Sequence, residues 1–225
     1  WAPGDAFNRI HWKSTARHGD IQVKEFDLEQ TADAWIILDL QRGIQAGRGE
    51  ESTTEAAIRA AASIADKALG ENRAVGMTVN AGRTAYLPAD RGGRQHQKVM
   101  QLLAAVEADS ASPLVETLIA SVGRLRRGMT AVIITASLDP SWVRPLAALR
   151  TRGVACVVVT VDAAAYARAE SETRAALTGA RPLLDAEAAE SAAKRSRALR
   201  HALAEYELPA FNVVPGTELG EILAR

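Results

Sequence analysis

The chain has 225 residues, and its 27 basic and 27 acidic side chains give it no formal net charge at pH 7. This length suffices for one sizeable core, and the balanced charge argues against a global attraction to nucleic acid or to an anionic membrane. The lone cysteine, Cys156, excludes an internal disulfide, and no run approaches the roughly 20 apolar residues of a membrane helix. Because the chain starts at Trp1 without a methionine, we interpret it as a piece of a longer protein.

The first 30 residues do not share the alternation of strands and helices that begins near residue 33. We therefore predict an amino-terminal arm over residues 1–30, which ends an upstream region, and one α/β domain over residues 31–225.

Short apolar segments of that domain are predicted to be strands. Those at 34–40, 130–137 and 154–162 are almost continuously apolar, as expected of strands buried on both faces. Residues 73–80 and 84–89 are expected to pair across a tight turn, and 209–215, flanked by prolines, is expected at an edge.

Helical periodicity fills the intervals between these strands. Ser52 and Glu55 form a capping box for a helix to about residue 70, whose buried side chains are expected to include Ile58. A helix from Pro113 is expected to bury a stripe that includes Ile119. Further helices are predicted at 99–106, 139–149, 163–177, 185–206 and from 217 onward. The alternation predicts a doubly wound α/β domain, with a mostly parallel sheet and helices on both faces.

Acidic residues follow three predicted strands, namely Asp39, Asp139 and Asp162. In a doubly wound sheet ligands bind beyond the carboxyl ends of the strands, so these carboxylates could together hold Mg²⁺. The alternative, that they cap helices and shape turns, is favoured because aspartate often follows a strand in those roles. The sequence contains no phosphate-binding loop and no GxSxG elbow, and Cys156, among valines, is interpreted as an inert core thiol.

Two basic clusters stand out, at 123–128 and 194–201. The first lies at the carboxyl end of a predicted helix, where cations offset the helix dipole. Because the net charge is zero and no aromatic residues are interleaved, both clusters are interpreted as solvated helix faces rather than nucleic-acid sites.

The opening stretch, WAPGDAFNRIHWKSTARHGDIQVKEF, contains P-G-D, a short gap and then I-x-W-K-x-[ST]-A-R. In order and spacing it resembles the signature of the bacterial family called domain of unknown function 58. The matching residues are Pro3, Gly4, Asp5, Ile10, Trp12, Lys13, Thr15, Ala16 and Arg17. The resemblance implies a von Willebrand factor A-like fold for the rest of the chain. It also implies an upstream membrane anchor, a cytoplasmic domain, and association with AAA+ ATPases of the MoxR type.

Von Willebrand A domains that bind a metal carry D-x-S-x-S just after the first core strand. The matching segment here is DLQRG, in which Asp39 is retained but Gln41 and Gly43 replace the two hydroxyl residues. A later strand end, where the resemblance implies a further aspartate, carries Ala136, with Asp139 three residues on. One carboxylate without hydroxyl ligands suits a hard cation poorly, so this metal motif is interpreted as degenerate.

Two functions remain open. The favoured hypothesis is a non-catalytic protein-interaction or scaffold domain, with no cofactor and no nucleic-acid partner, that works with a MoxR-type ATPase. The alternative is a Mg²⁺-dependent phosphoesterase or nuclease that uses Asp39, Asp139 and Asp162, with His11 or Lys13 near the developing charge.

Overall fold

The computed structural model describes residues 32–179 and 186–217. The chain divides into two units, residues 1–31 and 32–225, and the described residues belong to the second. The signature residues between Pro3 and Arg17, and the helix predicted from residue 217 onward, lie outside the described residues.

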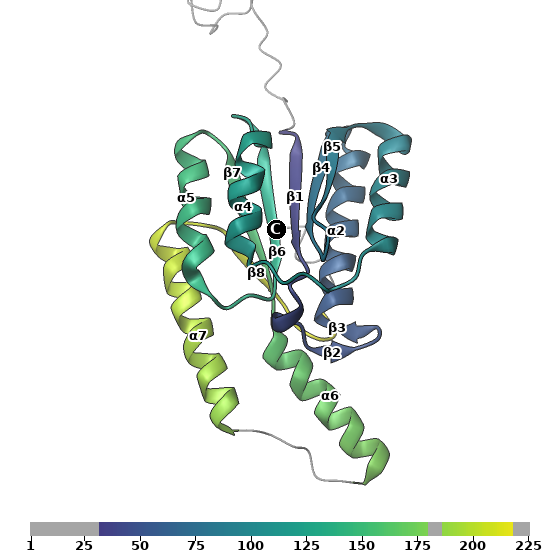
Figure 1. Cartoon of the computed structure of the whole chain (residues 1–225), viewed down its shortest axis with the longest axis vertical. Coiled ribbons are helices and arrows are strands. Elements are labelled where there is room, and N and C mark those ends of the chain that lie inside the picture. The colour runs from purple at the N-terminus through teal and green to yellow at the C-terminus, as the bar shows by residue number, and fades with distance from the viewer. Residues whose placement is uncertain (1–31, 180–185, 218–225) are drawn as a thin grey trace, which may run out of the picture. The chain divides into compact units, whose positions relative to one another are not determined.

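A six-stranded sheet runs through the domain in the order β5-β4-β1-β6-β7-β8 (Figure 1). Its strands are β1 (Ala34–Asp39), β4 (Val75–Asn80), β5 (Ala85–Asp90), β6 (Thr130–Thr135), β7 (Ala155–Val161) and β8 (Ala210–Val213). Neighbouring strands pair in parallel except β4 and β5, which form an antiparallel hairpin at one edge. The prediction of a mostly parallel, doubly wound sheet is confirmed, as is the edge position of β8.

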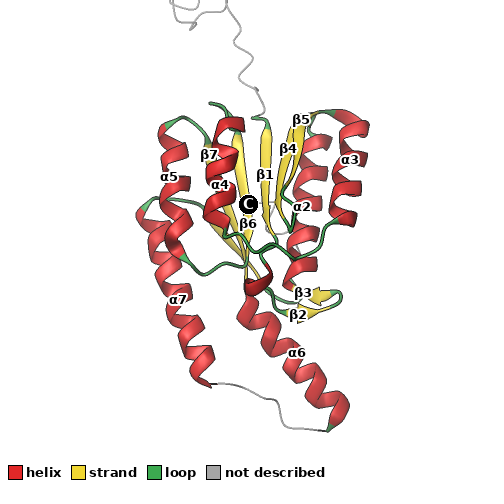
Figure 2. Ribbon diagram, in the orientation of Figure 1, coloured by secondary structure: helices red, strands yellow, loops and turns green. Residues whose placement is uncertain are grey.

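Helices cover both faces of this sheet (Figure 2). They are α2 (Thr53–Gly70), α3 (Gly92–Ala105), α4 (Leu114–Ser121), α5 (Val143–Thr151), α6 (Ala163–Thr178) and α7 (Ala186–Glu205). Side chains alternate along β1, so Ile36 and Leu38 pack with α2 and α3, whereas Trp35 and Ile37 pack with α4, α5 and α7. The central strands are therefore buried on both sides, which is why their sequences are almost continuously apolar.

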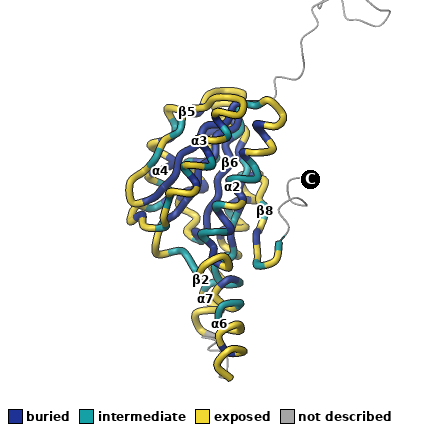
Figure 3. Tube along the Cα trace, turned by 90° about the vertical axis from the view of Figure 1, so that its right-hand side faces the viewer, coloured by how far each residue is buried: buried dark blue, intermediate teal, exposed yellow. Residues whose placement is uncertain are grey.

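Two helices extend beyond the carboxyl ends of the strands. α6 begins directly after β7 and buries Tyr166 in the core on the α2 side, but many of its later residues are exposed (Figure 3). α7 buries Leu199 and Leu203 in the core on the opposite side. A short hairpin, β2 (Gly47–Arg48) and β3 (Glu51–Ser52), contacts α6. Within the part of the chain that the structure describes, no helix is long and apolar enough to cross a membrane.

Side-chain caps determine where several helices begin. Oγ of Ser52 accepts a hydrogen bond from the backbone N–H of Glu55 at 3.2 Å, as the capping box predicts. Asp139 accepts one from the N–H of Ser141 at the start of a 3-10 turn, η4 (Pro140–Trp142), that leads into α5. Each cap depends on residues only two or three positions apart, and for that reason the sequence alone predicts it.

The predicted buried faces of the helices are less accurate. The prediction that Ile119 is buried is wrong, because its side chain is 62% exposed. α4 has only 8 residues, and its buried ones are Leu114, Thr117, Leu118 and Ser121. In α2 the buried positions are mainly alanines, which let the helix lie close to the sheet, and Ile58 is only half-buried.

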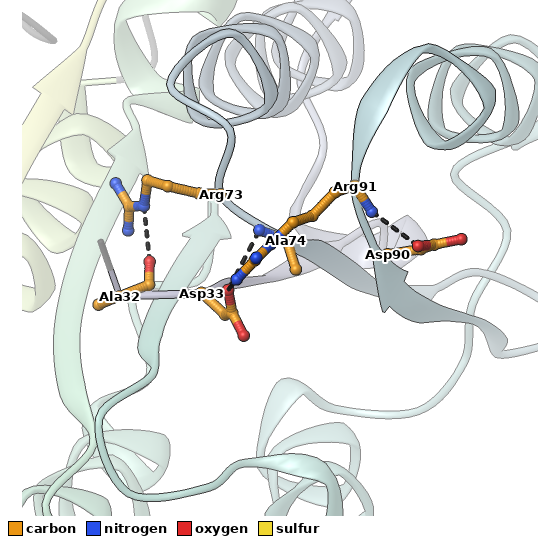
Figure 4. A network of polar contacts seen from close by, with 6 residues as sticks. All are labelled: Ala32, Asp33, Arg73, Ala74, Asp90 and Arg91. Atoms are coloured by element: carbon orange, nitrogen blue, oxygen red, sulfur yellow. Dashed lines mark hydrogen bonds and ion pairs between the residues drawn. The ribbon is translucent and has the colours of Figure 1, made fainter. Parts of the chain in front are cut away.

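A polar network ties the start of β1 to the ends of the β4–β5 hairpin (Figure 4). The carboxylate of Asp33 accepts hydrogen bonds from the backbone N–H of Ala74 at 3.1 Å and from Nη2 of Arg91 at 3.0 Å. Nε of Arg73 donates to the carbonyl oxygen of Ala32 at 2.6 Å. Partial burial works against ionisation, but the hydrogen bonds and the two guanidinium charges outweigh it and lower the pKa of Asp33.

Candidate functional site

Three polar residues end neighbouring strands at the carboxyl edge of the sheet. Asp39 is the last residue of β1, Asn80 of β4 and Thr135 of β6, and all three are fully buried. Because β1 lies between β4 and β6 and runs parallel to both, these strand ends meet at one place. The strand order reverses there, and in doubly wound sheets this is where ligands bind.

Asp39 is the centre of a closed set of hydrogen bonds. Its Oδ1 accepts from Nδ2 of Asn80 at 2.8 Å and from the backbone N–H of Gln41 at 3.2 Å. Its Oδ2 accepts from Oγ1 of Thr135 at 2.7 Å. Both carboxylate oxygens therefore have donors from the protein itself.

Asn80 connects Asp39 to the loop between α3 and α4. Its Nδ2 also donates to the carbonyl oxygen of Ser112 at 3.0 Å, while its Oδ1 accepts from Oγ of Ser110 at 2.7 Å. Exchanging the amide nitrogen and oxygen would place two acceptors against each other, so these partners determine the orientation of the amide. The backbone N–H of Arg42 donates to the carbonyl oxygen of Ser110 at 2.9 Å and holds this loop against the segment after β1.

Burial changes the pKa of the Asp39 carboxyl. Burial raises the pKa of the Asp39 carboxyl, and the hydrogen bonds that it accepts oppose this rise only in part. None of its three donors carries a charge, since they are an amide, a hydroxyl and a backbone N–H.

The residues at the positions of the metal motif do not fit Mg²⁺. This ion needs oxygen ligands, but the oxygens of Asp39 face N–H and O–H donors. Gln41 contributes its backbone N–H, Gly43 is exposed in a 3-10 turn, η2 (Arg42–Ile44), and Ala136 is buried without a side-chain oxygen. Among the described residues, no group of three or more His, Cys, Asp or Glu side chains is placed to hold a metal ion.

Asp139 and Asp162 act as helix caps. Oδ1 of Asp139 accepts from the backbone N–H of Ser141 at 3.0 Å, and its Oδ2 accepts from the hydroxyl of the same residue at 2.7 Å. Oδ1 of Asp162 accepts from the backbone N–H of Ala165 at 2.9 Å in the first turn of α6. Within residues 32–179 and 186–217, the structure therefore does not assemble Asp39, Asp139 and Asp162 into the metal cluster that the enzyme hypothesis requires.

The sequence analysis named Asp39, whereas it did not identify the residues that bind its side chain. Asn80 and Thr135 carry one usable signal, because Asn80 ends the strand predicted at 73–80 and Thr135 lies two residues before the end of the strand predicted at 130–137, much as Asp39 lies one residue before the end of its own. Parallel strand ends share one edge of the sheet, so the three side chains could have been grouped. Ser110 offers no comparable signal, since it lies in a loop far from Asp39 in the sequence.

Comparison with known proteins places the chain in a family. The family model described as "Protein of unknown function DUF58" matches residues 1–206. Uncharacterized protein Rv1480 of Mycobacterium tuberculosis is 30% identical over 169 residues, which cover 72% of this chain and 53% of that protein. Uncharacterized protein YeaD of Bacillus subtilis is 23% identical over 114 residues, or 51% of this chain and 27% of that protein. The chain thus spans about half the length of its mycobacterial relative and less of the other.

One solved structure shows the same fold at low sequence identity. The SpRpn10 VWA domain is similar with a TM-score of 0.52 and 11% identity, and the match covers 86% of this chain and 93% of that one. BatB from Bacteroides thetaiotaomicron is 20% identical with a TM-score of 0.46, over 58% of this chain and 66% of that one. With the strand order described above and the family match over residues 1–206, the chain belongs to the DUF58 family and has a von Willebrand factor A-like α/β fold.

Proposed function

We propose that this domain is a non-catalytic protein-interaction module of a membrane-anchored bacterial protein that works with a MoxR-type AAA+ ATPase. The closed hydrogen-bond network at the carboxyl edge is the observation that carries the non-catalytic part. An enzyme of this fold would use that edge to hold a metal or a substrate, but here Asn80 and Thr135 already occupy the oxygens of Asp39.

The single thiol also fits a structural role. Cys156 lies in β7 with 4% of its surface exposed, and burial raises the pKa of its thiol to about 11. A thiol that stays protonated near neutral pH is a weak nucleophile, so Cys156 is not a candidate for covalent catalysis.

The membrane anchor and the ATPase partner belong to the proposal for the whole protein. They are supported by membership of the DUF58 family. Because this chain covers 53% of the mycobacterial relative that it matches, they are proposed for the whole protein and not for this domain alone. The fold adds a physical argument, because α6 and α7 extend beyond the carboxyl edge and present exposed side chains that the core does not use.

A retention experiment tests the partnership. The full-length parent protein is immobilised and incubated with the MoxR-type ATPase of the same organism, without nucleotide, with ATP and with a non-hydrolysable ATP analogue. We expect specific retention of the ATPase that changes with nucleotide. Absence of retention under all three conditions would remove the partnership from the proposal.

Calorimetric titration with Mg²⁺ and Mn²⁺ tests the non-catalytic part. We expect no saturable heat of binding and no hydrolysis of p-nitrophenyl phosphate or single-stranded DNA. Saturable binding together with hydrolysis, both of which disappear in Asp39→Asn but persist in the matched control Asp33→Asn, would establish the metal-dependent enzyme instead.

A further inference from the structure

Three adjoining pockets lie at the carboxyl edge, between α6, α7 and the loop that follows β6. The first, of about 340 Å³, is bounded by the start of α4, by η4 and by α7. The second, of about 410 Å³, is bounded by η2, α6 and α7. Leu138 and Arg195 line both, and a third pocket of about 360 Å³ shares Leu138 and Arg168 with the second. We name the three together the α6–α7 groove.

One residue that lines the first pocket of the α6–α7 groove carries a buried hydrogen-bond donor without an acceptor. Trp142 lines this pocket and is 1% exposed, and its indole N–H has no hydrogen-bond partner among the described residues. Buried polar groups are normally paired, and an indole N–H can only donate. Trp35 shows the usual situation, since its Nε1 donates to Oγ1 of Thr78 at 3.0 Å. The indole N–H of Trp142 is therefore a buried donor that the described residues leave unsatisfied, in a residue that lines this pocket.

Arg195 adds a positive charge to the same pocket. In α7, Leu199 and Leu203 are buried against the sheet, and Arg195 lies one helical turn before Leu199 on the same face. The face that packs on the sheet thus continues past the strand ends as a wall of the groove. Arg195 takes part in none of the ion pairs that the structure describes.

Positive charge exceeds negative charge along the walls of the α6–α7 groove. Its arginines are Arg168, Arg195, Arg197 and Arg200, none of which forms an ion pair within the described residues. Its acidic wall residues are Asp139 and Asp162, both of which already accept backbone hydrogen bonds as caps. Four positive charges against two negative ones make this surface complementary to an acidic partner.

We propose that the α6–α7 groove binds an acidic peptide segment in which a glutamate or aspartate neighbours an aliphatic residue. The carboxylate accepts hydrogen bonds from the guanidinium of Arg195 and the indole N–H of Trp142, and the aliphatic side chain packs against Leu138 and Val115. A peptide is favoured over nucleic acid because the two pockets at Arg195 offer no exposed aromatic ring on which a base could stack. This proposal deepens the proposed interaction function and rests on it, but it does not require that the partner is the ATPase.

Indole N–H signals in a ¹⁵N-correlated NMR spectrum provide the test, because the chain has only four tryptophans. The probe is the blocked peptide Glu-Leu-Glu-Glu-Leu-Glu, titrated into the whole 225-residue chain. Trp142→Phe and Trp35→Phe assign the two relevant signals. We expect the Trp142 signal to move and saturate while that of Trp35 stays in place, and we expect the glutamine version of the peptide to cause no shift.

Matched charge variants test the role of Arg195. Arg195→Gln should weaken binding about tenfold, as expected for the loss of a charge-assisted hydrogen bond. Lys194→Gln removes the same charge from the neighbouring position, which does not line these pockets, and should change the affinity by less than about twofold.

Several results would overturn the proposal. They are equal binding of the glutamine peptide, equal effects of Arg195→Gln and Lys194→Gln, and a Trp142 signal that never moves. Oligouridylate that shifts Trp142 in place of the peptide would assign the groove to nucleic acid. If the ATPase is not retained but the peptide binds, only the proposed ATPase partnership is refuted. If the ATPase is retained but the peptide does not bind, only peptide binding by the α6–α7 groove is refuted.

Discussion

Two aspartates at opposite ends of β1 show how position in the fold decides the chemistry of one residue type. Asp33, just before the strand, is partly exposed and accepts hydrogen bonds from Arg91 and from a backbone N–H. Asp39, at the last position of the strand, is fully buried and has only neutral donors. The pKa of Asp33 is lowered, because cations and hydrogen bonds outweigh its burial, whereas burial dominates at Asp39 and raises its pKa.

The difference also bears on function. A carboxylate with a low pKa and an exposed side is available to ligands, yet Asp33 lies at the amino edge, away from the ligand-binding end of the sheet. Asp39 lies at that end but is occupied internally. At the ligand-binding end of β1, the carboxylate oxygens are therefore already hydrogen-bonded within the protein.

Removing the side chain of Asp39 should have the largest effect on stability. Asp39→Ala leaves Nδ2 of Asn80 and the hydroxyl of Thr135 without their buried acceptor, so we expect a loss of about 2–4 kcal/mol in the free energy of unfolding. Urea denaturation followed by circular dichroism measures it. Asp33→Ala is the control, with an expected loss below about 1 kcal/mol because its ion pair is exposed. Equal losses would contradict the contrast between the two edges.

Thr135→Val should have an intermediate effect. It keeps the shape of the side chain but removes the donor to Oδ2 of Asp39 and the acceptor of the N–H of Ser137. We expect a loss of about 1–2 kcal/mol by urea denaturation. Thr130→Val, at the other end of β6, is the matched control and should cost little, since the hydroxyl of Thr130 lies away from this network. A neutral result for Thr135→Val would mean that the network contributes no stability.

The two carboxylates should affect the pH dependence of stability with opposite signs. The pKa of Asp33 is lowered from 3.8, so its contribution is present above pH 3.8 and is lost as the pH falls through the folded value. The pKa of Asp39 is raised from 3.8, so the folded state holds its proton more tightly and loses stability as the pH rises above 3.8.

Thermal unfolding between about pH 2.5 and pH 6 measures these signs. Asp33→Asn should be about 0.5 kcal/mol less stable than the parent near pH 6, with a smaller deficit at the acid end. For Asp39→Asn, stability relative to the parent should improve as the pH rises. The same trend in both variants would refute the assigned environments.

The reactivity of the Cys156 thiol measures the effect of burial on an ionisable group, and this measurement does not depend on comparing the stability of variants. Burial is the main cause that raises its pKa from 9.0 to about 11, against a weaker opposing effect of Arg150. At pH 8 the folded protein should therefore react with iodoacetamide about 100-fold more slowly than the urea-unfolded chain. Equal rates would show that β7 opens readily.

Features that depend on neighbouring residues were predicted more accurately than features that depend on residues far apart in the sequence. Capping by Ser52 and Asp139 was predictable, since donor and acceptor are two or three residues apart. The exposure of Ile119 was not, because periodicity indicates that a helix has an apolar face but does not show how far its neighbours cover that face. Asn80 and Thr135 illustrate the same limit at the site, since they lie 41 and 96 residues from Asp39.

By itself, the sequence determined the strands of the six-stranded sheet, most of the helices, the caps and the family, because these depend on short patterns and on the opening motif. Only the tertiary structure decided which polar side chains meet. The order β4-β1-β6 brings Asn80 and Thr135 to the two sides of Asp39, and the extension of α7 past the sheet places Arg195 in the wall of the same pocket as Trp142. Those contacts depend on the parallel pairing of strands far apart in the chain, which no local pattern of residues encodes.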